Sequence, residues 1–240
     1  MLTDKVVLVT GAAKRIGRGI ALRLTGEGAR VAIHYGGSES EARATAAECG
    51  GAPIFQADLT KVADIERLYA EVTGHFGHID CVVNNAGRFT RFDPLDVTEA
   101  DWDFIHNVNL KAVFFSCQQA AKRMIERGEG GRIVNISSLG GIKAWAHHAH
   151  YCASKAGQIH MTKALAKAWG PHRITVNSVA PGVIEFGNPP DELISRLICQ
   201  TPARRSGTPD EIADAVVYFL GASDFVTGQV MAVDGGLSIR

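Results

Sequence analysis

The sequence predicts an α/β fold built on one doubly wound, seven-stranded parallel sheet with helices on both faces. Short runs of apolar and β-branched residues alternate with longer segments of helical periodicity along the whole chain. No change of composition, Ser/Pro-rich linker or internal repeat divides the 240 residues. We therefore expect residues 1–240 to form a single domain.

Composition and charge exclude several classes of protein. The 25 basic residues balance the 25 acidic ones, so the chain offers no electrostatic footprint for nucleic acid or an acidic membrane. No stretch approaches the roughly 18 apolar residues of a membrane span, and the N-terminus lacks the pattern of a signal peptide. The five cysteines form no Cys-x-x-Cys, which is typical of reduced thiols. We expect a cytoplasmic protein that binds neither nucleic acid nor membrane.

The first strand, turn and helix predict a site for a nucleotide phosphate. A strand over residues 6–10 is buried on both faces and ends at Gly11, and a helical pattern follows. The start of a helix offers unpaired N–H groups, and glycine lets an anion approach the backbone. Gly17 and Gly19 fit this pattern, but Arg15 stands where a glycine is expected. An ordinary strand-to-helix connection would look similar, so the other elements decide.

The remaining elements follow in order. Further strands are predicted at residues 29–35, 52–56, 79–83, 132–137, 174–180 and 230–233. Further helices are predicted at residues 38–49, 61–76, 98–127, 151–169, 190–200 and 209–220. Ser38, Thr98 and Thr208 are expected to cap three of these helices, and Thr98 forms a capping-box variant with Asp101. A break is expected within the 98–127 helix.

Polar and turn-forming residues gather where the predicted strands end. They are Gly11, His34, Asp58, Asn85, Ser138 and the pair Pro181-Gly182. The carboxyl ends of parallel strands lie at one edge of the sheet, and ligands of doubly wound sheets bind there. This coincidence favours a nucleotide site over an ordinary connection.

Tyr151 and Lys155 stand four residues apart on a predicted helix and therefore share a face. A phenol with a pKa near 10 is a poor acid–base catalyst at neutral pH, but a neighbouring ammonium group would lower that pKa. Ser138 ends the fifth strand and is placed to hydrogen-bond a substrate oxygen. The three residues together predict a catalytic site.

These motifs resemble those of the short-chain dehydrogenase/reductases over essentially the whole chain. The matching residues are Thr10-Gly11 through Gly17, Asp58-Leu59, Asn84-Asn85-Ala86-Gly87, Asn109, Ser138, Tyr151-x-x-x-Lys155 and Pro181-Gly182. The resemblance implies a Rossmann fold, a nicotinamide cofactor and hydride transfer between a carbonyl and an alcohol. It also implies a homotetramer or homodimer.

The resemblance assigns a role to each matching residue. Tyr151 would exchange the proton, Lys155 would lower its pKa, and Ser138 would orient the carbonyl oxygen. Asn109 would open a helix for a proton-relay water. The cofactor would contact Gly11, Ile16, Gly17, Asp58, Leu59, Asn85, Ala86, Gly87, Tyr151, Lys155, Pro181, Gly182 and Ile184.

The end of the second strand indicates which cofactor is bound. Enzymes that prefer NAD usually carry a carboxylate there, about 20 residues past the glycines, but the first carboxylate here is Glu39. Arg15 lies in the turn beside this position, and an arginine can fork onto a phosphate while a serine hydroxyl adds a bond. We therefore predict NADP(H), with Arg15, His34, Tyr35 and Ser38 in its site.

Two family branches suit the substrate site. The 3-oxoacyl-carrier-protein reductases match the Ser138, Tyr151 and Lys155 set and imply a ketone, including carrier-protein or CoA thioesters. The pteridine reductases match Arg15, His34-Tyr35 with Ser38, and the aromatic Phe89, which could stack on a pterin; they carry an Asp where this chain has Ser138. We favour a small-molecule carbonyl substrate. A non-catalytic NADPH-binding sensor or scaffold is the alternative of another class.

The predicted substrate contacts are Phe89, Trp145, His147 and Phe186. Residues 185–205 are expected to form a substrate lid, and Phe186 stands where the family often has Thr. His147, His148 and His150 lie close together but lack a partnering carboxylate or cysteine pattern, so no metal site is expected.

Overall fold

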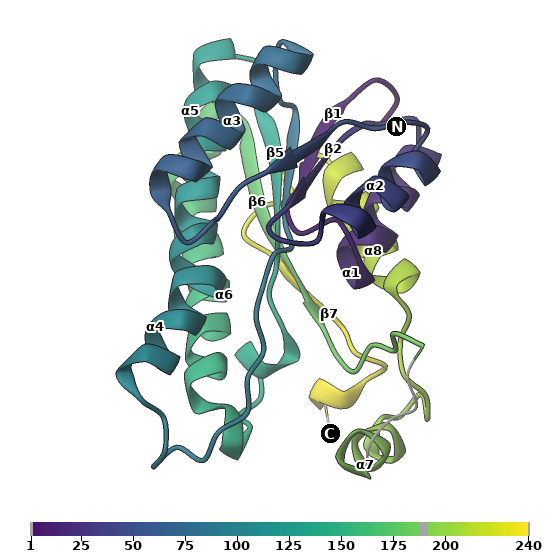
Figure 1. The fold of residues 1–240 in the computed structure, drawn as a ribbon, viewed down its shortest axis with the longest axis vertical. Coiled ribbons are helices and arrows are strands. Elements are labelled where there is room, and N and C mark those ends of the chain that lie inside the picture. The colour runs from purple at the N-terminus through teal and green to yellow at the C-terminus, as the bar shows by residue number, and fades with distance from the viewer. Residues whose placement is uncertain (1, 188–191, 240) are drawn as a thin grey trace.

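The structure, a computed structural model, describes residues 2–187 and 192–239. Its seven strands form one parallel sheet in the order β3-β2-β1-β4-β5-β6-β7 (Figure 1). The predicted doubly wound sheet is therefore confirmed. The strands are β1 Val6–Val9, β2 Arg30–Tyr35, β3 Ile54–Gln56, β4 Cys81–Asn84, β5 Gly131–Ile136, β6 Ile174–Pro181 and β7 Val230–Val233.

The helices follow the predicted order. They are α1 Arg15–Gly26, α2 Glu39–Glu48, α3 Val62–Phe76, α4 Glu99–His106, α5 Ala112–Arg127, α6 Ala149–Trp169, α7 Glu192–Gln200 and α8 Pro209–Gly221. None of these described helices combines the length and the apolar character that a membrane crossing requires.

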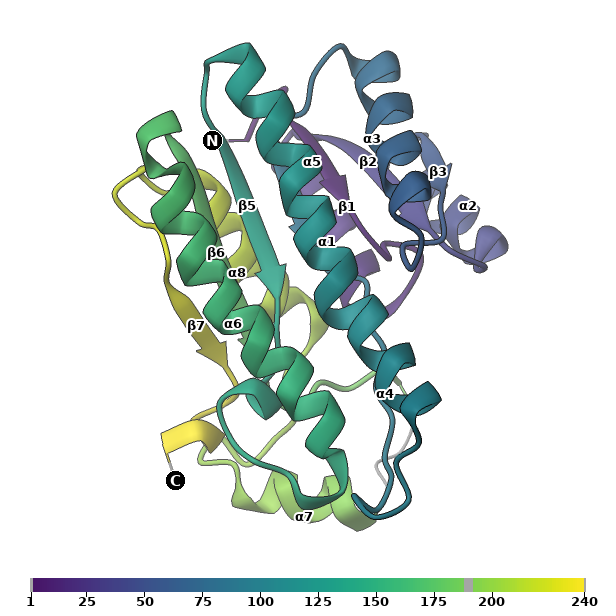
Figure 2. The ribbon, with the colours of Figure 1, turned by 90° about the vertical axis from the view of Figure 1, so that its left-hand side faces the viewer.

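Helices cover both faces of the sheet. Helices α1, α2 and α8 pack on one face, and α3, α5 and α6 pack on the other (Figures 1 and 2). Successive side chains of β1 point to opposite faces, so Val7 and Val9 join one core cluster and Leu8 joins the other. Burial on both faces explains why β1 is apolar without alternation.

The chain reverses its direction of travel across the sheet beside β1. Val9 of β1 pairs with Ile33 of β2 on one side and with Val83 of β4 on the other. This is the switch point at which doubly wound sheets open a crevice beyond the carboxyl ends of their strands. It brings the loops after β1, β2 and β4 to one place.

The predicted helix at 98–127 is divided into three parts. A π-helical segment, Asn107–Lys111, separates α4 from α5. Thr98 and Asp101 form the predicted capping box at the start of α4, and Thr208 and Glu211 form another at the start of α8. Ser38 occupies the position before α2, but its side chain makes no capping hydrogen bond, so the expected cap at Ser38 is wrong.

Candidate active site

The turn after β1 is held so tightly that two of its positions require glycine. Gly11 has φ +63°, and a β carbon there would lie 2.9 Å from the Cα of Ala86. A β carbon on Gly17 would lie 2.2 Å from the Gly11 carbonyl oxygen and 2.5 Å from Nδ2 of Asn85. Both approaches are closer than atoms can pack, so these glycines allow the β1 turn, α1 and the β4 loop to meet.

Asn85 ties the loop after β4 to this turn. Its Nδ2 donates to the carbonyl oxygens of Thr10 and Gly11, at 3.0 Å each. The hydroxyl of Thr10 accepts from the backbone N–H groups of Asn85 and Ala86 at 3.0 and 3.1 Å. The side chain of Asn85 therefore helps to build the predicted cofactor site.

The first turn of α1 suits an anion. Lys14 precedes α1 without making a side-chain capping bond, and the first turn carries no acidic residue. The N–H groups of this turn therefore lack a capping oxygen and lie at the positive end of the helix dipole. Together with the glycines of the turn, they fit the diphosphate of a dinucleotide.

Arg15 and Lys14 point in different directions. The guanidinium of Arg15 lies 5.2 Å from the ring centroid of Phe186, in the segment that follows β6, and Arg15 has a left-handed φ of +54°. The Nζ of Lys14 lies 3.7 Å from Oε1 of Glu41 on α2. The cation that faces the start of α2 is therefore Lys14, while Arg15, the predicted cofactor residue, faces Phe186.

Both residues border one hollow in the surface. It has a volume of about 530 Å³ and is lined by Lys14, Arg15, Arg18, Gly19, Glu185, Phe186, Gly187, Pro209 and Asp210. The hollow joins the start of α1 to the segment after β6, which is predicted to hold the nicotinamide end of the cofactor.

His34 supports the turn from inside. Its Nδ1 accepts from the N–H of Gly11 at 3.0 Å, and its Nε2 lies 3.1 Å from the carbonyl oxygen of Ala57. Because a carbonyl only accepts, Nε2 carries the proton and the ring is neutral. Burial lowers the pKa of His34 to about 4. The ring therefore positions Gly11, and the direct cofactor contact predicted for His34 is corrected to this indirect role.

The other predicted cofactor residues lie along the same edge of the sheet. Tyr35 ends β2 and Ser38 precedes α2. Ile16 lies in the first turn of α1, and Leu59 packs against the α3 side of the core.

The carboxylate of Asp58 accepts hydrogen bonds from the backbone N–H and the hydroxyl of Thr60. These bonds, above all the one from the hydroxyl, lower the pKa of Asp58. Pro181 ends β6, Gly182 bonds to Val233, and Ile184 pairs with Gly207.

Ser138 and Tyr151 are brought together as predicted. Ser138 follows β5, and its Oγ accepts from the N–H of Gly140 at 3.0 Å. A β carbon on Gly140 would lie 3.1 Å from Cε1 of Tyr151, so the turn that holds Ser138 packs against the ring of Tyr151 near the start of α6. Both side chains are buried.

Lys155 lies one helical turn beyond Tyr151. Its Nζ donates to the carbonyl oxygen of Ile136 at 2.9 Å and to Oε1 of Gln158 at 3.1 Å. A β carbon on Gly87 would lie 3.6 Å from this Nζ and 3.3 Å from Oδ1 of Asn109. Gly87, Lys155 and Asn109 therefore meet at one point beside the predicted nicotinamide ribose site.

Burial controls the protonation of both groups. It raises the pKa of Tyr151 to about 12 and lowers the pKa of Lys155 to about 7. The sequence predicted that Lys155 lowers the pKa of Tyr151. The structure instead gives a raised pKa, because desolvation disfavours the phenolate. At neutral pH the phenol of Tyr151 therefore keeps its proton.

Asn109 sits in the π-helical segment and is fully buried. Its Oδ1 accepts from the N–H of Arg88 at 2.8 Å, while its Nδ2 donates to the carbonyl of Arg88 at 2.9 Å and to Oγ of Ser154 at 3.3 Å. The expected break in the helix is therefore a π-turn at which Asn109 grips the loop after β4.

Aromatic rings surround Tyr151. The ring of Phe89 meets Tyr151 edge-on at 4.8 Å, and the ring of Trp145 lies parallel to it at 6.4 Å. His148 stacks on Phe89 at 4.6 Å, whereas the predicted substrate residue His147 faces Asp93 at 3.9 Å. The short 3₁₀ turn at Ala146–His148 determines that His148 rather than His147 points toward Phe89. The sequence alone does not show which of the two histidines takes that direction.

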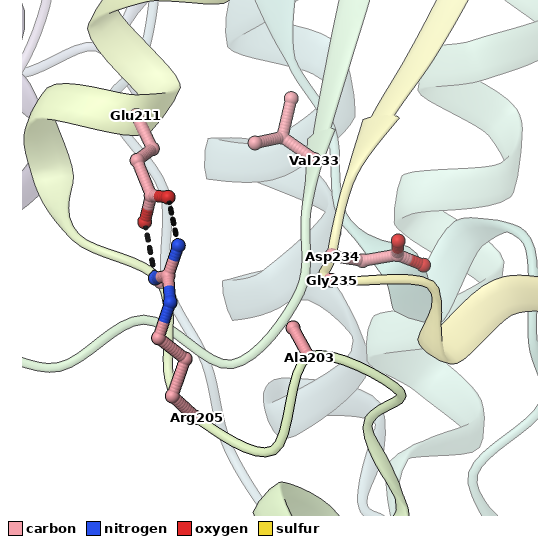
Figure 3. Close-up of a pocket in the computed structure, with 7 residues that line it drawn as sticks. Ala203, Arg205, Glu211, Val233, Asp234 and Gly235 are labelled. Carbon is pink, nitrogen blue, oxygen red and sulfur yellow. Dashed lines mark hydrogen bonds and ion pairs between the residues drawn. The ribbon is translucent and has the colours of Figure 1, made fainter.

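The segment predicted as a lid is anchored at its far end. Arg205 and Glu211 form a two-pronged ion pair, with N···O distances of 2.9 and 2.5 Å (Figure 3). They border a pocket of about 40 Å³ beside Val233, Asp234 and Gly235, too small for more than a water molecule or two. Of the predicted lid, residues 188–191 lie outside the described residues.

Within the described ranges, no cluster of three His, Cys, Asp or Glu side chains is arranged to hold a metal ion. His148 and His150 instead bond to Thr90.

The chain is similar to known proteins over its full length. Residues 11–238 match the family model described as enoyl-(acyl carrier protein) reductase. The chain is 36% identical over 246 residues to the 2-dehydro-3-deoxy-D-gluconate 5-dehydrogenase of Escherichia coli K12, covering 100% of this chain and 97% of that protein. It is 38% identical over 248 residues to a Staphylococcus aureus 3-oxoacyl-[acyl-carrier-protein] reductase, covering 99% of each.

A solved structure matches equally well. It is a double mutant of a Serratia marcescens short-chain dehydrogenase/reductase, with a TM-score of 0.92, 35% identity and 99% of each chain covered. Similarity of sequence and structure over the full length identifies this chain as a member of the short-chain dehydrogenase/reductase family.

Proposed function

We propose that this oxidoreductase uses NADPH to reduce a carbonyl to an alcohol, with Tyr151 as the proton donor and a 3-oxoacyl thioester or similar ketone as the substrate. The observation that carries the proposal is the closeness of the buried Ser138 and Tyr151 side chains. The Oγ of Ser138 bonds the N–H of Gly140, and a β carbon on Gly140 would lie 3.1 Å from Cε1 of Tyr151. Two hydroxyl groups that converge in a buried site can bind one carbonyl oxygen, and either can donate to it. A relative named as a 3-oxoacyl-carrier-protein reductase supports this substrate class.

The residues divide the reaction between them. A bound nicotinamide would supply the hydride. Ser138 would orient the carbonyl oxygen, and Tyr151 would donate its proton as negative charge develops there. Two of the three Nζ donors of Lys155 are used by Ile136 and Gln158, which leaves one for a ribose hydroxyl. The charge of Lys155 would favour the phenolate that remains.

The preference for NADPH is proposed to rest on Lys14 and Ser38, with Arg15 at the diphosphate side. No carboxylate stands between His34 and Ser38 to bind an unphosphorylated ribose. Lys14 faces α2, and its ion pair with Glu41 is half-exposed and therefore weak. A 2′-phosphate would compete for this ammonium group.

The cofactor proposal is tested by Lys14→Ala. Loss of one charged hydrogen bond should weaken NADPH binding about tenfold and leave NADH binding within about twofold. Titration of both cofactors measures this, and Lys167→Ala, which alters an exposed lysine in the last turn of α6, is the control. An equal loss for NADH and NADPH would contradict the assignment.

The substrate class is tested by NADPH consumption with acetoacetyl thioesters, small diketones and dihydropterin in parallel. Dihydropterin is the second candidate because Phe89 is 59% exposed beside Tyr151 and could stack on a flat ring. Turnover of a ketone or thioester supports the proposal, whereas turnover of dihydropterin alone would replace it. NADPH binding without turnover of any carbonyl would favour a sensor or scaffold.

The chain is further proposed to act as one domain with residues 185–205 as its lid. Backbone bonds join Glu185 to Gly207 and Gly207 to Val183. The Arg205–Glu211 pair fixes the far end of the lid to α8. Helix α7 lies beyond the carboxyl ends of the strands, at the end of the molecule where α6 begins (Figures 1 and 2).

A homotetramer is the proposed assembly, in the cytoplasm. Large apolar side chains are exposed on two separate parts of the chain: Trp102, Phe104, Phe114 and Ile125 on α4 and α5, and Tyr218 and Phe225 on and after α8. Two such surfaces suit the two interfaces of a tetramer. All five cysteines are free thiols, as expected in a reducing compartment. Light scattering that gave a monomer at micromolar concentration would overturn the assembly.

A further inference from the structure

The loop between β4 and α4 owes its position to side-chain contacts. Residues 85–98 form no helix or strand, so hydrogen bonds from other elements must hold them. Asn109 holds the first part, because its side chain bonds both the N–H and the carbonyl of Arg88. The next residue of the loop, Phe89, contacts the ring of Tyr151.

Three hydrogen bonds fasten the next part of the loop to the segment that enters α6. The Nδ1 of His148 lies 2.9 Å from the carbonyl oxygen of Thr90. The Nε2 of His150 lies 2.7 Å from Oγ1 of Thr90. The N–H of Phe92 donates to the carbonyl of His147 at 3.0 Å. Thr90 is therefore gripped by two histidines that immediately precede Tyr151, and we call this arrangement the histidine clamp.

Phe89 lies between the two anchored residues, Arg88 and Thr90. Its ring meets Tyr151 edge-on at 4.8 Å and stacks on His148 at 4.6 Å. More than half of the ring is nevertheless exposed. A bulky apolar residue with a free face beside the phenol forms a wall of the site, and its distance from Tyr151 depends on how Arg88 and Thr90 are held.

The protonation of the clamp follows from its partners. A carbonyl only accepts, so Nδ1 of His148 carries a proton. His150 is 1% exposed, and its Nδ1 has no hydrogen-bond partner among the described residues. Nε2 of His150 and the Thr90 hydroxyl form the one hydrogen bond of this ring among the described residues, and the hydroxyl can donate or accept in it. The titratable groups near His150 are His148 in its own segment and Asp101 and His106 on α4; burial disfavours a second proton on His150 at neutral pH.

We propose that His148 and His150 are positioning residues, which act through Thr90 to hold Phe89 against Tyr151 and so set the shape of the carbonyl site. This rests on the proposed reductase function, in which Tyr151 is the proton donor. Neither histidine touches the reacting atoms. Their loss should therefore impair substrate binding more than the chemical step.

Thr90→Val tests the clamp with the smallest change. Valine keeps the branched shape of threonine and removes the hydroxyl that His150 binds. The KM for the ketone should rise about threefold to tenfold, while kcat and NADPH affinity stay within the error of the wild type. Tm should fall slightly, because the buried Nε2 of His150 loses its partner. Thr90→Ser restores the hydroxyl and should restore KM. Leu95→Ala, in the same loop at a residue that is 95% exposed, serves as the background control.

His148→Phe extends the test to the second bond. Phenylalanine keeps a ring on which Phe89 can stack but lacks the N–H that binds the Thr90 carbonyl. Combined with Thr90→Val, it should raise KM beyond either single change. A Thr90→Val enzyme with the KM of Thr90→Ser would overturn the proposal. A fall in NADPH affinity as large as the rise in KM would also overturn it, because equal effects on both ligands mark a general structural role.

Hydrogen–deuterium exchange tests the histidine clamp without relying on enzyme turnover. In ligand-free Thr90→Val, residues 88–97 should exchange faster than in Thr90→Ser, with no change in α6. If wild type reduces no carbonyl, the proposed function fails, yet this exchange difference still tests the clamp. Equal exchange in the two variants would remove the clamp even if the enzyme is active.

Discussion

Tyr151 and Lys155 show how burial sets the chemistry of single residues here. Each side chain is almost completely enclosed, and burial shifts each pKa in the direction that favours the neutral form. The pKa of Tyr151 rises to about 12, and that of Lys155 falls to about 7. Burial therefore favours the neutral phenol of Tyr151 and disfavours the charged form of Lys155. A charge on Lys155 costs stability that its bonds to Ile136 and Gln158 only partly offset.

A pH dependence of stability follows for Lys155. Its folded pKa of about 7 lies below the ordinary value of 10.5, so between these values the unfolded chain binds more protons. The free energy of unfolding should therefore rise with pH in this window. From about pH 7 to about pH 8.5, it should rise by on the order of 1–2 kcal/mol more in wild type than in Lys155→Met. Urea titrations of both proteins measure the difference, and parallel pH curves would contradict the buried charge.

At the residue scale, the sequence predicted where side chains stand on their elements better than which partners they contact. Ser138, Tyr151 and Lys155 follow from their spacing, because a strand end and one helical turn fix them locally. His34 turned inward, since the turn after β1 and the end of β3 both offer it backbone partners. The different directions of Lys14 and Arg15 could not be predicted, because they depend on the left-handed backbone at Arg15.

At the scale of elements, the strand–turn–helix unit of β1 and α1 depends on close approach of backbones. Gly17 faces the Gly11 carbonyl, while Gly26 at the end of the same helix has open space around it. Periodicity predicted both elements. It did not predict the π-turn at Asn109, because that turn forms around bonds to Arg88, a residue 21 positions away.

Gly17→Ala should disrupt the cofactor site. Its β carbon would overlap the Gly11 oxygen and Asn85, so the turn must shift and NADPH affinity should fall more than tenfold. Gly26→Ala is the matched control on α1 and should leave binding unchanged while stabilising the fold by about 0.5–1 kcal/mol. Calorimetric titration and thermal melts give both readouts. Normal NADPH affinity in Gly17→Ala would show that the turn does not hold the cofactor.

At the scale of the molecule, sheet order explains why distant segments meet. β1 and β5 flank β4, so the turn at Gly11, the loop with Asn85 and the Ser138 strand end reach one edge. The alternation of strands and helices predicted a doubly wound parallel sheet, and the structure adds the order of its strands. That alternation could not predict how residues 85–98 fold over Tyr151, since their position depends on side chains from α6 and the π-turn.

The most direct test of the central claim compares wild type with Tyr151→Phe. Phenylalanine preserves the ring that Phe89 and Trp145 contact and removes only the phenol hydroxyl. NADPH-dependent reduction of the ketone identified in the substrate panel should fall about a hundredfold or more, as expected for loss of a general acid. NADPH affinity should stay within about twofold. A variant that retains more than half of the wild-type turnover would show that Tyr151 is not the proton donor.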